Sequence, residues 1–205
     1  MQRSKSSQRA NTKAHKSAGK SGSIRIISGK FKGRRLPVKD AEGLRPTTDR
    51  VKETVFNWLM PYCANAVVLD CFAGSGGLAF EALSRHAESA TIIEMNKQAA
   101  EQIKQNLQLL DITNATLTQG DALKVLASDG HPHNLVFIDP PFRKNLATPV
   151  CDLLEKNDWL ADDAVIYLEM ESELGEPVVP DSWQLLKEKI AGQVAYRLYE
   201  RCVKR

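Results

Sequence analysis

"LDCFAGSGGLAFEAL", residues 69–83, joins an apolar run that ends at Asp70 to a second apolar stretch with helical spacing. Three glycines, Gly74, Gly76 and Gly77, lie between the two. Glycines at a strand-to-helix junction let the backbone turn sharply and let a ligand approach closely, while the first N–H groups of the helix remain available as donors. The stretch therefore predicts a strand, a glycine-rich ligand loop and a helix.

Strand-like and helical segments continue to alternate downstream of this loop. Strand-like runs occupy 66–72, 90–94, 115–119, 134–139 and 164–169, with helical stretches near 77–86, 97–110, 121–128 and 147–157. Several runs are nearly continuous Val, Ile and Leu, which indicates strands covered on both faces. Residues 183–201 break the alternation, because they read as two strands around Ala191-Gly192. We expect an α/β fold whose parallel, doubly wound sheet ends in an antiparallel hairpin.

The segment before the loop divides into two parts. Residues 24–38 alternate apolar and basic side chains around Ser28-Gly29, which predicts a β-hairpin. The first 23 residues are rich in Ser, Lys, Ala and Gln, a composition typical of disorder. Since 205 residues suit one domain, we expect a basic tail over 1–23 and one domain over 24–205, with the hairpin as its N-terminal extension.

Charge is distributed unevenly along the chain. Residues 1–35 hold eleven Lys or Arg and no acid, whereas the rest holds the other 17 of the 28 basic residues and all 25 acids. An acidic body with a basic arm is typical of proteins that bind polyanions. For residues 1–22 a solubilising tail is an equal alternative, but the interleaved apolar residues that follow favour a nucleic-acid surface. Its candidate substrate-binding residues are Arg25, Lys30, Lys32, Arg34 and Arg35.

Other features narrow the class of protein. Four cysteines are present, Cys63, Cys71, Cys151 and Cys202. None has C-x-x-C spacing, so we expect reduced packing residues instead of disulfides or a zinc site. No apolar run approaches the roughly 20 residues of a membrane span, and the N-terminus has no apolar segment of a secretory signal. His131 and His133 flank Pro132 and predict an exposed loop. We expect a cytoplasmic monomer without a metal or a membrane partner.

Three acids, Asp70, Glu94 and Asp121, end or directly follow predicted strands. The carboxyl ends of neighbouring parallel strands meet at one edge of the sheet, where open α/β sheets bind ligands. Glu94 can accept hydrogen bonds from two ribose hydroxyls, and Asp121 can accept from an adenine amino group or cap a helix. The glycine spacing also satisfies the dinucleotide fingerprint. The loop therefore predicts an adenosine-containing ligand, with an NAD enzyme as an alternative.

The fourth strand ends in Asp139-Pro140-Pro141-Phe142 at the same edge. Prolines fix φ and remove N–H donors, so the Asp139 carboxylate and the Pro140 carbonyl form a rigid pair of acceptors. Such a pair suits a planar exocyclic amine, and Phe142 can stack on the ring that carries it. Accepting both amine hydrogens favours a pyramidal nitrogen that can attack a sulfonium methyl group. Alone, the motif also fits a strand-ending turn; beside the glycine loop, it predicts methyl transfer to nitrogen.

These two motifs resemble those of amino-group methyltransferases that use S-adenosylmethionine: residues 139–142 match [DN]-P-P-[FYW], and residues 69–83 resemble the cofactor motif. A wider set resembles the bacterial 16S rRNA guanine-N2 methyltransferase family RsmD over about residues 22–202. It comprises "RIISGKFKGRRLPV", "GLRPTTDRVKETVFNWL", "LDCFAGSGGLAFEALSRHA", "IEMN", "NLVFIDPPF" and "VAYRLYER". The Ser/Lys-rich tail over 1–21 departs from the family pattern.

The resemblance implies S-adenosylmethionine-dependent methylation of the exocyclic N2 of one guanine in 16S rRNA, within an assembled or nearly assembled small ribosomal subunit. It implies a Rossmann-like class I fold with a seven-stranded, mostly parallel sheet of order 3-2-1-4-5-7-6, the last strand antiparallel, and helices on both faces. The implied cofactor-binding residues are Asp70, Ala73, Gly74, Gly76, Glu94, Asp121 and Ala122. Asp139, Pro140 and Phe142 are implied at the target base as catalytic residues, and Pro141 adjoins the substrate.

Two alternatives remain at this stage. The motif over 139–142 alone does not separate methylation of guanine N2 from methylation of adenine N6. We expect no separate target-recognition domain within 205 residues, which argues against an adenine-N6 enzyme that modifies a specific DNA sequence. An RNA-binding assembly factor that has lost catalysis is disfavoured, because the acids and Phe142 are intact.

Overall fold

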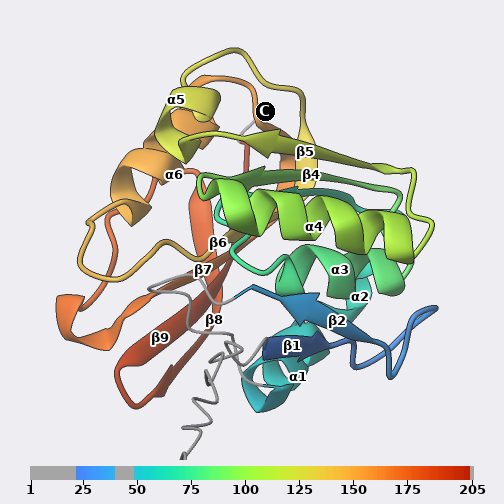
Figure 1. The fold of residues 1–205 in the computed structure, drawn as a ribbon. Helices are drawn as coiled ribbons and strands as arrows, with labels where there is room; N and C mark the ends of the chain where they lie inside the picture. Colours follow the sequence, from blue (N-terminus) through green and yellow to red (C-terminus); the bar gives the residue numbers. More distant parts are fainter. Residues whose placement is uncertain (1–21, 40–48, 204–205) are drawn as a thin grey trace, which may run out of the picture.

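The computed structural model describes residues 22–39 and 49–203 (Figure 1). The tail was predicted over 1–23; its first 21 residues lie outside the described residues, whereas Gly22 and Ser23 belong to a strand. Most of the "RPTTDR" segment, 45–50, which is part of the resemblance to the RsmD family, also lies outside the described residues. The N-terminal hairpin is confirmed: β1 (Gly22–Arg25) pairs antiparallel with β2 (Arg35–Val38), and Ile24 stands opposite Leu36. Both of these apolar side chains are buried, so the hairpin contributes to the core.

The large sheet confirms the strand order expected from the sequence. Its strands are β3 (Val67–Asp70), β4 (Ser89–Glu94), β5 (Ala115–Gln119), β6 (His133–Ile138), β7 (Leu160–Glu171), β8 (Trp183–Ala191) and β9 (Val194–Arg201). They are arranged β5-β4-β3-β6-β7-β9-β8, which is 3-2-1-4-5-7-6 when the sheet strands are counted in chain order. Strand β9 runs antiparallel to both of its neighbours. The parallel strands therefore end together at one edge.

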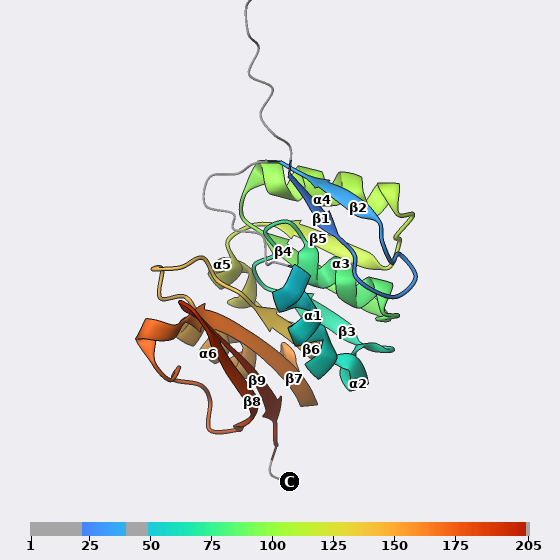
Figure 2. The same cartoon turned by 90° about the horizontal axis from the view of Figure 1, so that it is seen from below.

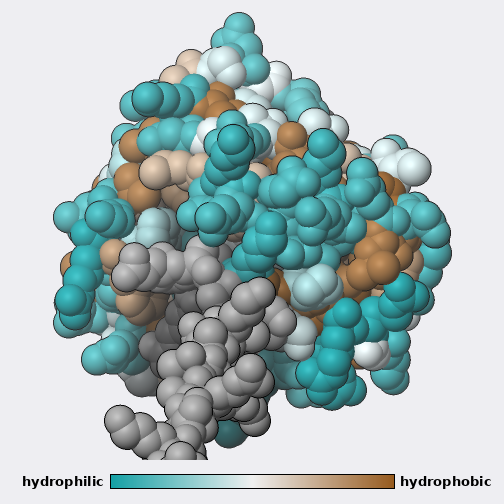
Figure 3. Space-filling model, in the orientation of Figure 1, coloured by the Kyte–Doolittle hydropathy of each residue, from teal (hydrophilic) through white to brown (hydrophobic). Residues whose placement is uncertain are grey.

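Helices cover both faces of this sheet (Figures 1 and 2). They are α1 (Asp49–Trp58), α2 (Met60–Cys63), α3 (Gly77–Ser84), α4 (Lys97–Leu109), α5 (Ala122–Leu126), α6 (Ala147–Lys156) and the short 3₁₀ helix η1 (Ser172–Leu174). One core contains the hairpin and α1 to α4, and the other contains α5 and α6. The face that carries α4 is largely hydrophilic (Figure 3). Within the described ranges, no helix has the length and apolarity to cross a bilayer.

A buried carboxylate attaches the hairpin to α3. Glu81 is fully buried and accepts hydrogen bonds from the backbone N–H groups of Ile27, at 2.8 Å, and Ser28, at 3.0 Å. It also pairs with Arg85 at 2.9 Å, while Lys52 lies 4.0 Å away. A charge buried on an otherwise apolar helix face is stable only when it is paired in this way. The basic segment is thus a docked part of the domain.

The predicted surroundings of two side chains were wrong. His133 was expected in an exposed loop, but it begins β6 and is fully buried, because its ring stacks on Trp159 with centroids 5.8 Å apart. Cys202 was expected to pack inside an element, but it follows the end of β9 and is exposed. The other three cysteines are buried and free, as expected.

Candidate active site

A cavity of about 890 Å³ opens at the carboxyl ends of the parallel strands. Nine sequence-predicted residues line it: Ala73, Gly74, Glu94, Asp121, Ala122, Asp139, Pro140, Pro141 and Phe142. They come from the segments that follow β3, β4, β5 and β6, which the strand order brings to a common edge. The volume falls within the range of small-molecule sites, roughly 300–1,000 Å³. The predicted cofactor loop and the predicted base site therefore share one cavity.

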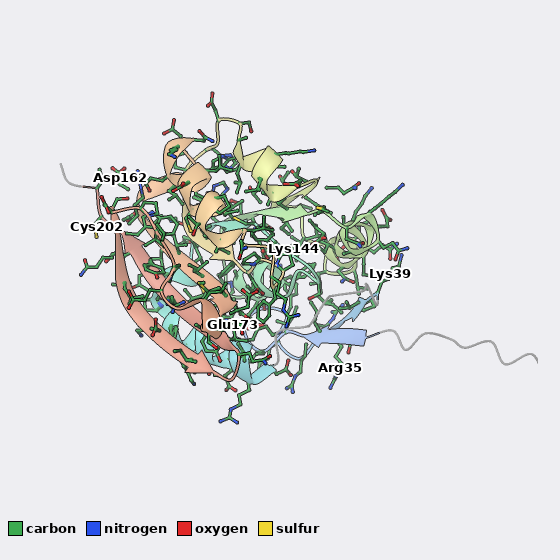
Figure 4. The ribbon with its side chains drawn as sticks, turned by 90° about the vertical axis from the view of Figure 1, so that its left-hand side faces the viewer. Arg35, Lys39, Lys144, Asp162, Glu173 and Cys202 are labelled. Carbon is green, nitrogen blue, oxygen red and sulfur yellow. The ribbon has the colours of Figure 1, made fainter. Side chains whose placement is uncertain are left out.

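Seven predicted residues lie outside the cavity lining. Asp70 and Gly76 are buried behind the loop. The five basic candidates, Arg25, Lys30, Lys32, Arg34 and Arg35, are exposed on the hairpin. In Figure 4, Arg35 and Lys39 project from the hairpin, and Lys144 lies nearer the centre of the molecule. Lys39 and Lys144 line the cavity, so two positively charged side chains contribute to its wall.

The glycine loop has the left-handed backbone that its sequence predicts. Gly74 and Gly76 have φ values of 55° and 78°, which favour glycine because a Cβ atom is crowded there. At Gly76 a Cβ would also stand 2.7 Å from the ring of Phe80. Gly76 precedes α3 directly, so its contribution is to the turn and to the packing of the helix. Gly74 alone of these two faces the cavity.

Glu94 holds the loop in place from the end of β4. Its carboxylate accepts hydrogen bonds from the N–H of Gly74 and the N–H of Asn96, each at 2.6 Å. Burial raises the pKa of Glu94, and these backbone hydrogen bonds oppose the increase. A carboxylate has about four acceptor positions, so ribose hydroxyls can still donate to it. The sequence reasoning identified the residue but missed its structural contacts.

Asp121 caps the short helix α5. One carboxylate oxygen accepts from the N–H groups of Leu123, at 2.8 Å, and Lys124, at 3.3 Å. This is the helix-capping alternative considered from the sequence, and it uses only one of the two carboxylate oxygens. Asp121 lines the cavity, so capping and ligand binding are compatible here.

Asp70 is a buried acid with a raised pKa. It is 1% exposed, and neither carboxylate oxygen has a hydrogen-bond partner of normal geometry among the described residues. Burial raises its pKa to about 7, opposed by the nearby N–H groups of Ala79 and Phe72 and reinforced by the charge of Glu94. An acid with such a pKa carries a proton for much of the time at neutral pH.

Asp139 stands at the end of β6, followed by the buried Pro140 and the half-buried Phe142. The pKa of Asp139 lies well above its usual range, first because of burial and then because of the charges of Glu169 and Asp70. Glu169 was missed by the sequence reasoning, although it also lines the cavity. The signal was available, because "AVIYLE" ends in an acid at the same sheet edge, just as the preceding strand ends near Asp139.

Comparison with known proteins gives consistent matches. Residues 24–200 match the family model described as conserved hypothetical protein 95. The chain is 57% identical over 181 residues to ribosomal RNA small subunit methyltransferase D of Escherichia coli (strain K12), which covers 88% of this chain and 91% of that protein. The protein of the same name in Haemophilus influenzae is 50% identical over 184 residues, covering 87% and 94%. The solved structure of yhhF from Escherichia coli is 54% identical, with a TM-score of 0.85, and covers 89% of this chain and 100% of that one.

Proposed function

The chain belongs to the RsmD family of methyltransferases, the family described as conserved hypothetical protein 95, and we propose that it methylates the exocyclic N2 of a guanine in 16S rRNA with S-adenosylmethionine as methyl donor. The names of the relatives support small-subunit rRNA as the substrate. We further propose that it acts as a monomer in the cytoplasm, on an assembled or nearly assembled small subunit.

One observation carries the choice of chemistry. The rigid acceptors of Asp139 and Pro140 line the same cavity as the glycine loop at Gly74. A methyl donor bound along the loop and an amine bound by the acceptors would therefore lie in the same cavity, with no protein segment between them. An NAD enzyme would use the loop but has no need of two prolines between a carboxylate and a ring.

The cavity residues fit S-adenosylmethionine. Gly74 lines the cavity without a side chain, so a ligand can approach its backbone closely. Glu94 retains acceptor positions for ribose hydroxyls, and Asp121 can accept from the adenine amine while it caps α5. When bound, the cofactor supplies an electrophilic methyl group on a sulfonium centre. Ala73 and Ala122 complete the apolar wall, while Asp70 and Gly76 shape the loop from behind.

The protein contributes position and preformed acceptors. Asp139 and the Pro140 carbonyl accept the two amine hydrogens, and Phe142 stacks on the base that carries them. An N–H donor favours the ionised form of a carboxylate, so binding of the amine opposes the effects that raise the pKa of Asp139. Because the cavity lies at the sheet edge, a paired base must be extruded to enter it.

The exposed cations of the hairpin support an RNA substrate. Lys32, Arg34 and Arg35 are exposed on β2 and on the turn before it, and Lys39 continues from β2 to the cavity. Contacts between such side chains and phosphates position a substrate without selecting its sequence. The hairpin would therefore guide the RNA backbone towards the base site.

Methyl transfer to small subunits tests the proposal. Subunits from a strain that lacks the enzyme are incubated with the protein and tritiated S-adenosylmethionine, the rRNA is digested to nucleosides, and the modified position is mapped. We expect label in N2-methylguanosine at one position, and none with subunits already methylated there. Label in N6-methyladenosine, or no transfer to the unmethylated subunits, would contradict the proposal.

A further inference from the structure

A second carboxylate lies beside Asp139 on the next strand. Strands β6 and β7 are parallel, and Ile138 pairs with Leu168 in their register, so Asp139 and Glu169 are the next residues of the two strands. One step back on the same face, the rings of Phe137 and Tyr167 contact each other with centroids 6.3 Å apart. Since side chains alternate along a strand, both carboxylates share that face. Both also line the cavity.

The position of Glu169 is defined by its neighbours. The hydroxyl of Tyr167 donates a hydrogen bond to its carboxylate at 2.7 Å. On the other side, Tyr196 of β9 stands opposite Glu169 in the antiparallel register and also lines the cavity. A carboxylate offers about four acceptor positions, so an acceptor held between two tyrosines can still bind a ligand donor. The structure therefore places a second, oriented acceptor next to the predicted amine site.

The two candidate bases differ in the atom that would meet this acceptor. In guanine the N2 amine is adjacent to N1–H, which is a donor. In adenine the N6 amine is adjacent to an N1 that carries a lone pair and is an acceptor. A carboxylate beside the amine site therefore pairs with guanine and repels adenine, a distinction that Asp139 and Pro140 cannot make, because both bases present an –NH2 group to them.

We propose that Glu169 accepts a hydrogen bond from N1–H of the target base and selects guanine over adenine. This assignment rests on the proposed function and extends it from the reacting amine to the rest of the base edge. The N2 amine and N1–H of guanine are adjacent donors, and the carboxylates of Asp139 and Glu169 are adjacent acceptors. Hydrogen bonds from guanine to both carboxylates offset the repulsion between the two negative charges. Burial, followed by the charge of Glu169, raises the pKa of Asp139.

The test uses a base that retains the reactive amine and lacks the donor. 2-Aminopurine carries the same exocyclic 2-amino group, but its N1 is an acceptor. Small subunits are reconstituted with rRNA that contains either guanine or 2-aminopurine at the mapped position, and kcat/KM for methyl transfer is measured for each. We expect the wild-type protein to prefer guanine by about 100-fold or more, because a site built to pair with a donor rejects the analogue without it.

Substitution of Glu169 then asks whether this residue causes the preference. In E169Q the side-chain amide can donate a hydrogen bond to N1 of 2-aminopurine. The ratio of kcat/KM for guanine to kcat/KM for 2-aminopurine should therefore fall by about 10-fold or more relative to the wild-type protein. E173Q is the matched control: it makes the same charge change four residues later, at an exposed position outside the cavity lining (Figure 4). Its preference should equal that of the wild-type protein.

The outcomes separate this inference from the proposed function. If the wild-type protein forms no N2-methylguanosine, the proposed function fails. If it does, but E169Q keeps the wild-type preference, the role of Glu169 is refuted. Should E169Q transfer to neither base, the same ratio is measured with E169A, and an unchanged ratio or complete inactivity there also refutes the assignment. Cofactor binding and thermal unfolding, measured for each variant, show that the fold is intact.

Discussion

Asp139 is expected to contribute to catalysis at the expense of stability. Asp139 is half-buried at the cavity, and its removal from bulk water, together with the charges of Glu169 and Asp70, raises its pKa. The folded protein therefore holds several acids in a region that disfavours charge. Asp139→Ala removes one of them. We expect methyl transfer to fall by about 100-fold or more, while S-adenosylmethionine affinity, measured by calorimetry, changes by less than about threefold.

The same variant should unfold at a higher denaturant concentration, or at the same one, since the lost acid has no ion pair with a basic side chain among residues 22–39 and 49–203. Asp162→Ala serves as the control, because Asp162 is an exposed acid at the opposite side of the molecule from Lys39 (Figure 4). Transfer by Asp139→Ala at nearly the wild-type rate would mean that the motif does not hold the amine.

His133 makes stability depend on pH. The Nδ1–H donates to the carbonyl of Trp159 at 3.2 Å, and in the neutral ring Nε2 accepts from the Thr91 hydroxyl at 3.1 Å. Burial, followed by the charge of His131, lowers its pKa from 6.5 to about 4. Between these pH values the unfolded chain binds more protons than the folded one. Stability should therefore be complete above pH 6.5 and decrease as the pH falls to about 4, by at most about 3 kcal/mol.

Urea unfolding at pH 7.5 and pH 5 measures this effect. His133→Phe should be less stable than wild type at pH 7.5, because the two hydrogen bonds are lost, but should lose less stability on acidification. His86→Asn is a suitable control, because His86 is exposed with a φ of 71° that asparagine tolerates. If His133→Phe shows the wild-type pH dependence, other groups must account for it.

The reactive motif was predictable from the sequence, whereas the contacts around it were not. The acids Glu94 and Asp139 follow apolar runs, so their place at the sheet edge follows from strand alternation alone. In contrast, the burial of His133 depends on Trp159, which is 26 residues away in sequence and contacts it only through the pairing of β6 and β7. The hydrogen bond from the Gly74 N–H to the Glu94 carboxylate likewise depends on loop geometry that the residue types do not specify.

At the scale of elements, α3 connects the cofactor loop to the RNA-facing hairpin. The helix begins after Gly76 and carries Glu81 near its middle, and Glu81 accepts from Ile27 and Ser28 of the hairpin turn. Ser84 adds a second link, because its hydroxyl accepts from the N–H of Phe31 at 2.9 Å. The cofactor loop and the hairpin should therefore behave as one rigid unit.

Glu81→Gln tests this connection. The amide keeps one acceptor but loses the charge that pairs with Arg85 and Lys52, so we expect a loss of about 3 kcal/mol in unfolding free energy. The amides of Ile27 and Ser28 should exchange with solvent faster in hydrogen-exchange measurements. Glu53→Gln changes an exposed acid on α1 and should alter neither quantity. Unchanged exchange in Glu81→Gln would show that apolar packing alone holds the hairpin.

Element order was easier to predict than element boundaries. The terminal hairpin around Ala191-Gly192 was identified from its two apolar-polar runs. Strand β7, however, begins at Leu160 instead of 164, because its first residues pair with β6 only across a register shift next to His133. Polar residues Asp162 and Asp163 concealed this extension, since they are exposed. Local pattern therefore located the centre of the strand and missed the irregular end.

At the scale of the molecule, the hairpin is part of the core and cannot be removed as an arm. Ile24 and Ile26 are both buried, at 6% and 2% exposure, so deletion of residues 1–35 would remove part of the core as well as the cations. The contribution of the basic residues must instead be measured by neutralising side chains that point to solvent. Lys32, Arg34 and Arg35 meet that requirement.

The triple variant K32Q/R34Q/R35Q should bind small subunits at least about 10-fold more weakly than the wild-type protein. The slope of log K against log salt concentration should decrease by about 2 to 3, because three fewer phosphate contacts release fewer counterions from the RNA. S-adenosylmethionine affinity should be unchanged, since none of the three residues lines the cavity. The control K124Q/K156Q/K189Q removes the same charge from exposed sites on α5, α6 and β8. If both variants lower the slope equally, the net charge of the protein governs association. If affinity and slope decrease only in the hairpin variant, the RNA backbone lies along β2, on the path that leads through Lys39 to the cavity.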